Sequence, residues 1–202
     1  MAERLTERYP SVLLDRADEP PPPEAIPIGY SMGGRIVLHA ALANPGRWPA
    51  LVLVGVSAGI DDPVARRKDD DELAGWIQRK PIADIVAMWE TQAAFATQSP
   101  ELVAAQREGR LSFEPPELAY LLRAFGQGVM PPIWDRLSAL DVPVLLLTGA
   151  LDEKYLAAGR RMASLLPRGT LETIPDAGHA PQLEAPEAVA DAIDSFLGEL
   201  RS

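Results

Sequence analysis

The sequence predicts an α/β protein with a mostly parallel sheet and a helical cap inserted between two of its strands. Apolar runs typical of buried strands, such as 51–56 and 142–148, alternate with helical segments. Between these two runs lies a long stretch rich in charge and tryptophan, without strand-like runs. We therefore expect a core of residues 1–60 and 141–202, and a helical cap of residues 61–140.

The first elements are expected before residue 44. Residues 2–9 have the pattern of a short amphipathic helix, and the apolar run 11–15 that of a brief buried strand. Residues 18–24 contain four consecutive prolines, which favour an extended polyproline connector. Residues 25–28 are expected to form a short strand, and residues 31–43 a helix that ends before Asn-Pro-Gly.

The remaining core elements are expected to alternate as in a parallel sheet. Continuous apolar runs predict the strands, and the closing helix places its apolar side chains on one face at helical spacing. The expected strands are 51–56, 142–148 and 170–174, and the expected helices are 155–166 and 186–200.

Composition excludes several classes of function. The chain has 202 residues, no cysteine and two histidines, so we expect one α/β core with no disulfide, metal or cofactor. It has no apolar run of twenty residues and a net charge of −10, which favour a cytoplasmic protein that binds neither membrane nor nucleic acid. Its cations are nearly all arginine, which suits a small carboxylate substrate. The oligomeric state stays open.

The strongest local signal is the segment 29–34, which reads Gly-Tyr-Ser-Met-Gly-Gly between an expected strand and an expected helix. A G-x-S-x-G turn in this context holds its serine in a strained backbone conformation, which small residues at positions 29 and 33 permit. The Ser31 hydroxyl is then exposed at the head of a helix, where the Met32 amide can stabilise negative charge. Taken alone, the motif also fits an ordinary glycine-rich turn.

A reactive serine needs a base, and the two histidines differ in position. His39 lies eight residues along the helix from Ser31, roughly 12 Å away at 1.5 Å per residue, so we expect it to pack the helix. His179 lies in a loop after the last expected strand, and Asp152 follows the strand before it. The order serine, acid, histidine, each after a strand, is the order of the α/β-hydrolase triad. We therefore expect Ser31, Asp152 and His179 to form a catalytic triad.

These three segments resemble the α/β-hydrolase superfamily. Within it the chain is most similar to the 2-succinyl-6-hydroxy-2,4-cyclohexadiene-1-carboxylate synthases of menaquinone biosynthesis, from about residue 29 to the C-terminus. The closer resemblance rests on Gly-Tyr-Ser-Met-Gly-Gly-Arg at 29–35, the run 65–70, Trp89, Phe95, Arg110, and the run 125–128 leading to Pro132 and Trp134.

The resemblance implies a lyase that eliminates pyruvate from a carboxylated cyclohexene intermediate. Ser31 would be the base that removes a ring proton, and no acyl-enzyme is required. Because the substrate carries several carboxylates, arginines would bind it as bidentate clamps. The implied substrate-binding residues are Tyr30, Met32, Arg35, Arg66, Trp89 and Arg110.

The three arginines differ in how their roles are supported. Arg35 lies one helical turn beyond Ser31 and so shares its side of the helix, independently of the resemblance. Arg66 has Arg67 beside it, and a small shift of register would exchange the two. For Arg110, a solvated position on the cap surface is the alternative.

The chain departs from the family before residue 29. Family members have a His-Gly-Phe-type loop, whose amide completes the oxyanion hole, and this sequence has none. We therefore expect the first strands of the fold to be missing and the sheet edge to be exposed. Either the gene product is mis-started or deleted, or another chain or a rearranged segment fills the gap.

Two other functions remain open. The first is a carboxylic-ester hydrolase that uses Ser31 as a covalent nucleophile. The second is an inactive truncated scaffold or binding protein that keeps the triad as a relic.

Overall fold

The computed structural model describes residue 9 and residues 21–201. The expected strand 11–15 and, apart from Tyr9, the expected helix 2–9 lie outside this part of the chain. The chain divides into two compact units. The first contains the described residues up to Ser57 together with residues 134–201, and the second is Ala58–Ile133. Residues 134–140, which the sequence prediction assigned to the cap, lie in the first unit.

The first unit is built on a four-stranded parallel sheet in the order β1-β2-β3-β4. One row of paired residues crosses all four strands, from Ile28 through Val52 and Leu145 to Thr170. Because the strands are parallel, their carboxyl ends lie along the same edge of the sheet. The strands are β1 (Ile28–Tyr30), β2 (Leu51–Val54), β3 (Val144–Gly149) and β4 (Gly169–Ile174).

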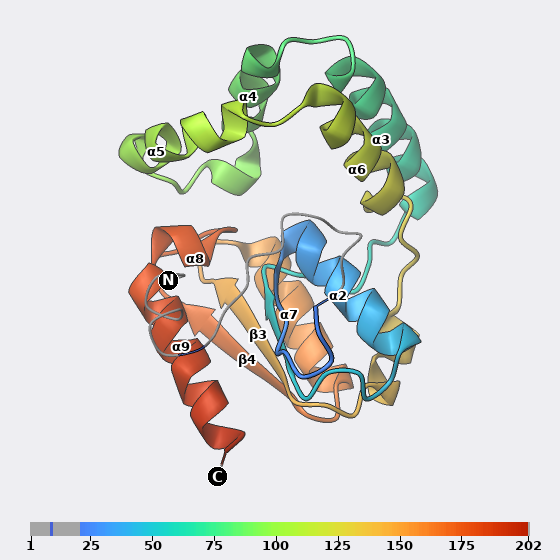
Figure 1. The fold of residues 1–202 in the computed structure, drawn as a ribbon, viewed down its shortest axis with the longest axis vertical. Coiled ribbons are helices and arrows are strands. Elements are labelled where there is room, and N and C mark those ends of the chain that lie inside the picture. Colours follow the sequence, from blue (N-terminus) through green and yellow to red (C-terminus); the bar gives the residue numbers. More distant parts are fainter. Residues whose placement is uncertain (1–8, 10–20, 202) are drawn as a thin grey trace. The chain divides into compact units, whose positions relative to one another are not determined.

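Helices cover both faces of this sheet, which is why every residue of β2 and β3 is buried. Helices α2 (Ser31–Ala43) and α7 (Glu153–Leu165) pack on one face, and the short 3₁₀ helix η2 (Trp134–Ala139) contacts both (Figure 1). Helix α9 (Pro186–Glu199) covers the other face with an apolar stripe centred on Ile193, and the short α8 (Pro181–Glu184) precedes it.

In the second unit, residues 58–133, every regular element is a helix. Helices α3 and α6 pack together around Ala74, Ile77 and Leu118, and α4 packs against α5 (Figure 1). Caps fix two of the helix starts, because the Asp62 carboxylate accepts from the Ala65 amide and the Ser99 hydroxyl from the Leu102 amide. The elements are α3 (Pro63–Ile77), α4 (Ile82–Glu90), η1 (Ala93–Phe95), α5 (Pro100–Leu111) and α6 (Pro115–Phe125).

The first described strand differs from the prediction. It begins at Ile28 rather than residue 25, because Pro27 has no N–H to donate and contributes only its carbonyl, which accepts from the Val52 amide at 2.9 Å. The end of the proline segment is also not an extended connector. It closes into a turn in which the Ala25 amide donates to the Pro22 carbonyl at 3.1 Å.

The other elements of the core are shifted from their expected ends by at most two residues, apart from the short helices α8 and η2, which were not expected. A four-residue helix lacks the repeated apolar spacing that identifies a longer one. No helix in the described part of the chain is long and apolar enough to cross a membrane.

Candidate active site

Ser31 lies on a sharp turn between β1 and α2, with a left-handed backbone φ of 48°. Two glycines make this turn possible. A Cβ on Gly29 would lie 2.5 Å from the Gly34 Cα, and one on Gly34 would overlap Val56 and lie 2.7 Å from the Gly29 carbonyl oxygen. Position 33 was expected to need a small residue for the same reason, and this is wrong, because a Cβ on Gly33 meets open space. The tight contact is one residue later.

His179 connects the serine to the acid. Its Nε2 lies 3.0 Å from the Ser31 Oγ, and its Nδ1 lies 2.8 Å from the Asp152 Oδ2. With Asp152 ionised, Nδ1–H donates to the carboxylate, and Nε2 is left to accept the serine proton. The imidazole is 7% exposed, so little water competes for these bonds. The structure thus brings together the three residues expected from the sequence, each following a different strand at the carboxyl edge of the sheet.

Asp152 is held by the start of helix α7, where its Oδ1 accepts from the Tyr155 amide at 3.2 Å. Burial of this carboxyl acts to raise its pKa. The hydrogen bonds from His179 and from the Tyr155 amide, with the electrostatic effects of His179 and Lys154, outweigh burial, and the pKa of Asp152 lies below its ordinary value. The acid therefore stays ionised at neutral pH, as the orienting member of a triad must.

Two glycines that the sequence analysis did not single out make room for the histidine. Gly55 follows β2 with φ of 59°, and a Cβ there would lie 2.9 Å from the His179 carbonyl oxygen and 3.3 Å from its Cε1. A Cβ on Gly149 would overlap the carbonyl oxygens of residues 177 and 178. Gly55 lies inside the expected strand 51–56 and Gly149 directly follows the expected strand 142–148, so both were readable as glycines in or beside an apolar strand. The close approach they permit depends on the tertiary fold.

Aromatic rings flank the imidazole. The Tyr155 ring centroid lies 4.3 Å from that of His179, and the Tyr30 centroid lies 5.4 Å from it. Tyr30 was expected near the site, whereas Tyr155 was not, because its place in the first turn of α7 gives no distinctive signal. Met32 is half-buried in the first turn of α2.

Arg35 is 6% exposed in the second turn of α2. It shares this helix with His39, whose pKa is lowered by burial and by the positive charges of Arg35 and Arg136. His39 is therefore neutral at pH 7 and is not the base that contacts Ser31, as expected from its distance along the helix.

In the second unit, Arg66 belongs to a polar network at the α3–α6 contact. Its Nε donates to the Asp70 Oδ1 at 2.7 Å, and its Nη1 donates to the Gln127 Oε1 at 3.2 Å. The other Asp70 oxygen accepts from the Gly128 amide at 3.1 Å, and Asp70 is 1% exposed. Arg67 points to solvent. Of these two arginines, Arg66 is the one held in a fixed orientation.

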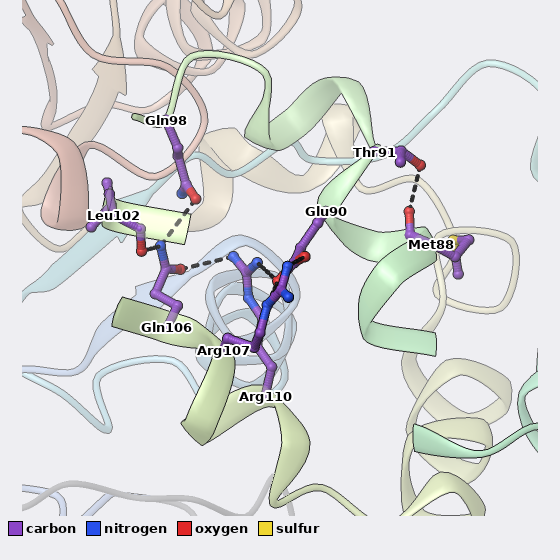
Figure 2. Close-up of polar contacts among 8 residues, drawn as sticks. All are labelled: Met88, Glu90, Thr91, Gln98, Leu102, Gln106, Arg107 and Arg110. Atoms are coloured by element: carbon purple, nitrogen blue, oxygen red, sulfur yellow. Dashed lines mark hydrogen bonds and ion pairs between the residues drawn. The ribbon is translucent and has the colours of Figure 1, made fainter. Parts of the chain in front are cut away.

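Arg110 lies in a second network, drawn in Figure 2. Its Nη2 donates to the Gln106 Oε1 at 2.9 Å, its Nη1 lies 3.7 Å from the Glu90 Oε1, and its guanidinium lies 4.7 Å from the Phe95 ring centre. Arg107 pairs with the same Glu90 carboxylate. Arg110 is 8% exposed, so it is not the solvated surface arginine that was the alternative.

Trp89 lies on α4, where it is partly buried against the apolar cluster formed by α3, α4 and α6. Its expected role in lining a pocket is not tested by this packing. Among the described residues, no group of three or more histidine and carboxylate side chains could hold a metal ion.

The geometry supports two kinds of chemistry. A serine hydroxyl bonded to an oriented imidazole can remove a proton from carbon, or it can attack a carbonyl as a nucleophile. In both cases the imidazole takes up the serine proton and the carboxylate stabilises the imidazolium.

The sequence is similar to a known protein family and to curated relatives. The model of the Alpha/beta hydrolase family matches residues 3–192. The chain is 36% identical over 176 residues to the "Putative 2-succinyl-6-hydroxy-2,4-cyclohexadiene-1-carboxylate synthase" of Bacillus subtilis, covering 84% of this chain and 64% of the relative. It is 32% identical over 174 residues to the synthase of Serratia proteamaculans, covering 84% of this chain and 66% of the relative. It therefore spans just under two thirds of the length of both.

Two solved structures agree with this fold. MenH from S. aureus superposes with a TM-score of 0.85 at 31% identity, over 100% of this chain and 74% of that one. A thermophilic esterase from Thermogutta terrifontis, with malate bound, superposes with a TM-score of 0.75 at 28% identity, over 89% of this chain and 66% of that one.

Proposed function

This chain belongs to the alpha/beta hydrolase family, and on that premise we propose that it is a carbon–oxygen lyase. It eliminates pyruvate from a carboxylated cyclohexene to give 2-succinyl-6-hydroxy-2,4-cyclohexadiene-1-carboxylate, a step of menaquinone biosynthesis. The observation that carries the proposal is the hydrogen-bonded chain from Ser31 through His179 to Asp152. The choice of a lyase is supported by the synthases to which this chain is similar.

In the proposed reaction, Ser31 and His179 move the protons. The Ser31 oxygen takes a proton from a ring carbon as its own proton passes to the His179 Nε2. The electrons of the broken C–H bond form a new double bond in the ring. At the same time the C–O bond to the pyruvate group breaks, and pyruvate leaves as its enolate. Asp152 stabilises the imidazolium through Nδ1. The enolate is protonated as the histidine returns to its neutral form, so no acyl-enzyme forms.

We assign substrate carboxylates to Arg35, Arg66 and Arg110, because a guanidinium matches a carboxylate in a bidentate pair. For Arg66 the network favours this role over Arg67. Asp70 and Gln127 engage its Nε and Nη1, which fixes the plane of the guanidinium and leaves Nη2 to donate to one carboxylate oxygen of the substrate, a single contact rather than a bidentate pair. The proposal also assigns Tyr30 and Trp89 to the pocket, as the resemblance implies, and the Met32 amide at the start of α2 to the stabilisation of negative charge.

An ester hydrolase is the second candidate, favoured by the likeness to the Thermogutta terrifontis esterase. The same hydrogen bonds would then make Ser31 a nucleophile, with an acyl-enzyme as intermediate. An inactive scaffold is the third candidate, and it predicts that Ser31→Ala leaves every measurable function unchanged.

One pair of assays separates these functions. The cyclohexene substrate is supplied, and released pyruvate is followed with NADH and lactate dehydrogenase. In parallel, p-nitrophenyl acetate is tested for a burst of p-nitrophenol. If the chain is a lyase, it should release pyruvate at a steady rate, and Ser31→Ala should abolish this release. Any burst of p-nitrophenol should be slower than the release of pyruvate. A rapid burst without pyruvate release supports the esterase and contradicts the lyase, and no activity in either assay supports the scaffold.

A further inference from the structure

The loop that carries His179 is bound on both sides of the histidine by one carboxylate. The Gly178 amide donates to the Glu184 Oε2 at 2.9 Å, and the Ala180 amide donates to the Glu184 Oε1 at 3.2 Å. Glu184 is the last residue of α8. The Ala180 carbonyl in turn accepts from the amides of Leu183 and Glu184, at 2.9 and 3.1 Å. The hydrogen bonds between the loop and the helix thus fix the backbone on both sides of His179.

A carboxylate suits this position for a chemical reason. The two amides converge on one side chain, and an ionised carboxylate has two acceptor oxygens and no donor. Hydrogen bonds to a charged acceptor are about twice as strong as neutral ones. A glutamine would offer one oxygen and turn an N–H toward the second amide, so it could satisfy one of the two bonds.

A second set of contacts on the loop comes from the backbone of neighbouring segments. Gly55 lies against the His179 carbonyl, Gly149 lies against the carbonyls of residues 177 and 178, and the Leu151 amide donates to the Ala177 carbonyl at 2.9 Å. These contacts stop the loop from moving toward the sheet. Without Glu184, the amides of Gly178 and Ala180 would lose the acceptor that holds the loop from the α8 side.

We propose that Glu184 is a positioning residue for catalysis. It fixes the backbone of residues 178–180 and thereby keeps the His179 Nε2 at 3.0 Å from the Ser31 hydroxyl. Glu184 acts through the loop and takes no proton in the reaction. This inference rests on the proposed function only in that the triad is reactive, and it holds equally for the lyase and the esterase.

The test compares Glu184→Ala and Glu184→Gln with Glu172→Gln, which removes the charge of an exposed glutamate on β4. Each variant is assayed for pyruvate release and for the rate at which a fluorophosphonate labels Ser31. Labelling forms an O–P bond, expels fluoride and passes the serine proton to His179, so it reports the serine–histidine pair without the substrate.

We expect Glu184→Ala to lower kcat and the labelling rate about 10- to 100-fold, because a catalytic group displaced by about 1 Å can cost 10² in rate. KM should change less than twofold. Glu184→Gln should fall between Glu184→Ala and the parent chain, and Glu172→Gln should match the parent. Thermal unfolding, followed by circular dichroism, identifies a temperature at which each variant is folded, and the rates are measured there.

A labelling rate in folded Glu184→Ala and Glu184→Gln equal to that of the parent would overturn the proposal. So would a change in KM with kcat unchanged, which would place Glu184 in substrate binding. A parent chain that releases no pyruvate contradicts the lyase assignment alone. Slower labelling of the Glu184 variants would then still support the positioning role.

Discussion

The two units hold the side chains of the proposed site in different ways. In the first unit, Ser31, His179 and Asp152 are bonded to one another, and each lies on a turn or loop at the end of a strand. In the second unit, arginines on helices are held by buried carboxylates. Asp70 holds Arg66, and Glu90 pairs with Arg107 and lies near Arg110 (Figure 2).

This difference indicates what each unit can tolerate. The triad depends on the shape of the backbone, because the approach of His179 requires glycine at positions 55 and 149. The arginine networks depend on charge, because removing one member of a buried ion pair leaves the other without compensation. Changes at the triad and at the glycines beside it should therefore alter the rate of chemistry. Changes in the second should alter substrate binding and the stability of the helices.

The largest effect should come from Ser31→Ala. Removing the hydroxyl removes the reacting atom, and loss of a triad serine costs roughly 10⁴- to 10⁶-fold in kcat in serine hydrolases. The free energy of unfolding, measured in urea, should change by less than about 1 kcal/mol, because the left-handed φ of residue 31 is kept. Residual pyruvate release above one hundredth of the parent rate would show that another residue is the base.

Gly55→Ala should have the next largest effect, through the backbone alone. The new Cβ would lie 2.9 Å from the His179 carbonyl oxygen, and the φ of 59° costs an alanine about 1–2 kcal/mol. We expect kcat to fall about 10- to 100-fold with a smaller change in KM. Gly198→Ala is the matched control, because a Cβ there meets open space on α9. Equal kcat in both variants would contradict the dependence of the triad on backbone shape.

The sequence was sufficient for the triad and for most of the first unit. Three reactive residue types, each after a strand, defined Ser31, Asp152 and His179, and apolar runs defined β2 and β3. The start of β1 was predicted less well. The strand begins only after Pro27, which has no backbone N–H to donate to the neighbouring strand. These features depend on local pattern and on spacing along the chain.

The contacts that support the site could not be predicted in the same way. Gly34 rather than Gly33 is in tight contact because Val56 packs over it, and that contact joins residues distant in sequence. The bond of Glu184 to the histidine loop requires α8, which is too short to show a period. Asp70 was readable as the i+4 partner of Arg66, but its second partner, the Gly128 amide, lies 58 residues away.

Asp70→Asn tests the second half of the comparison. The amide keeps the shape but removes the charge that pairs with Arg66, and loss of a hydrogen bond to a charged group costs about 1.5–3 kcal/mol of stability. Because Arg66 is part-exposed, we expect the lower end of this range. KM for the cyclohexene substrate should rise about tenfold, with kcat changed less. The readouts are urea unfolding and the pyruvate assay.

The control for this variant is Glu72→Gln on the same helix. Glu72 pairs with Lys68 at 3.9 Å, and both side chains are largely exposed, so its loss should cost less than about 1 kcal/mol. A fall in kcat with unchanged KM in Asp70→Asn would contradict the assignment of this network to binding. It would remove the proposed division of roles between the two units.

The smallest effect should appear in the pH dependence of stability. The pKa of Asp152 is lowered in the folded chain, against the effect of burial, by the hydrogen bonds from His179 and the Tyr155 amide and by nearby positive charge. A carboxyl with a lowered pKa stabilises the folded state above its unfolded pKa of about 4, and this contribution is lost as the pH falls through the folded value. Asp152→Asn lacks the contribution at every pH. In urea unfolding at pH 7, 5, 4 and 3, the stability of the parent relative to this variant should therefore decrease only at the acidic end. A difference that stays constant from pH 7 to pH 3 would mean that the folded chain does not favour the ionised carboxylate. The claim that hydrogen bonds to an ionised Asp152 hold the triad of the first unit would then be wrong.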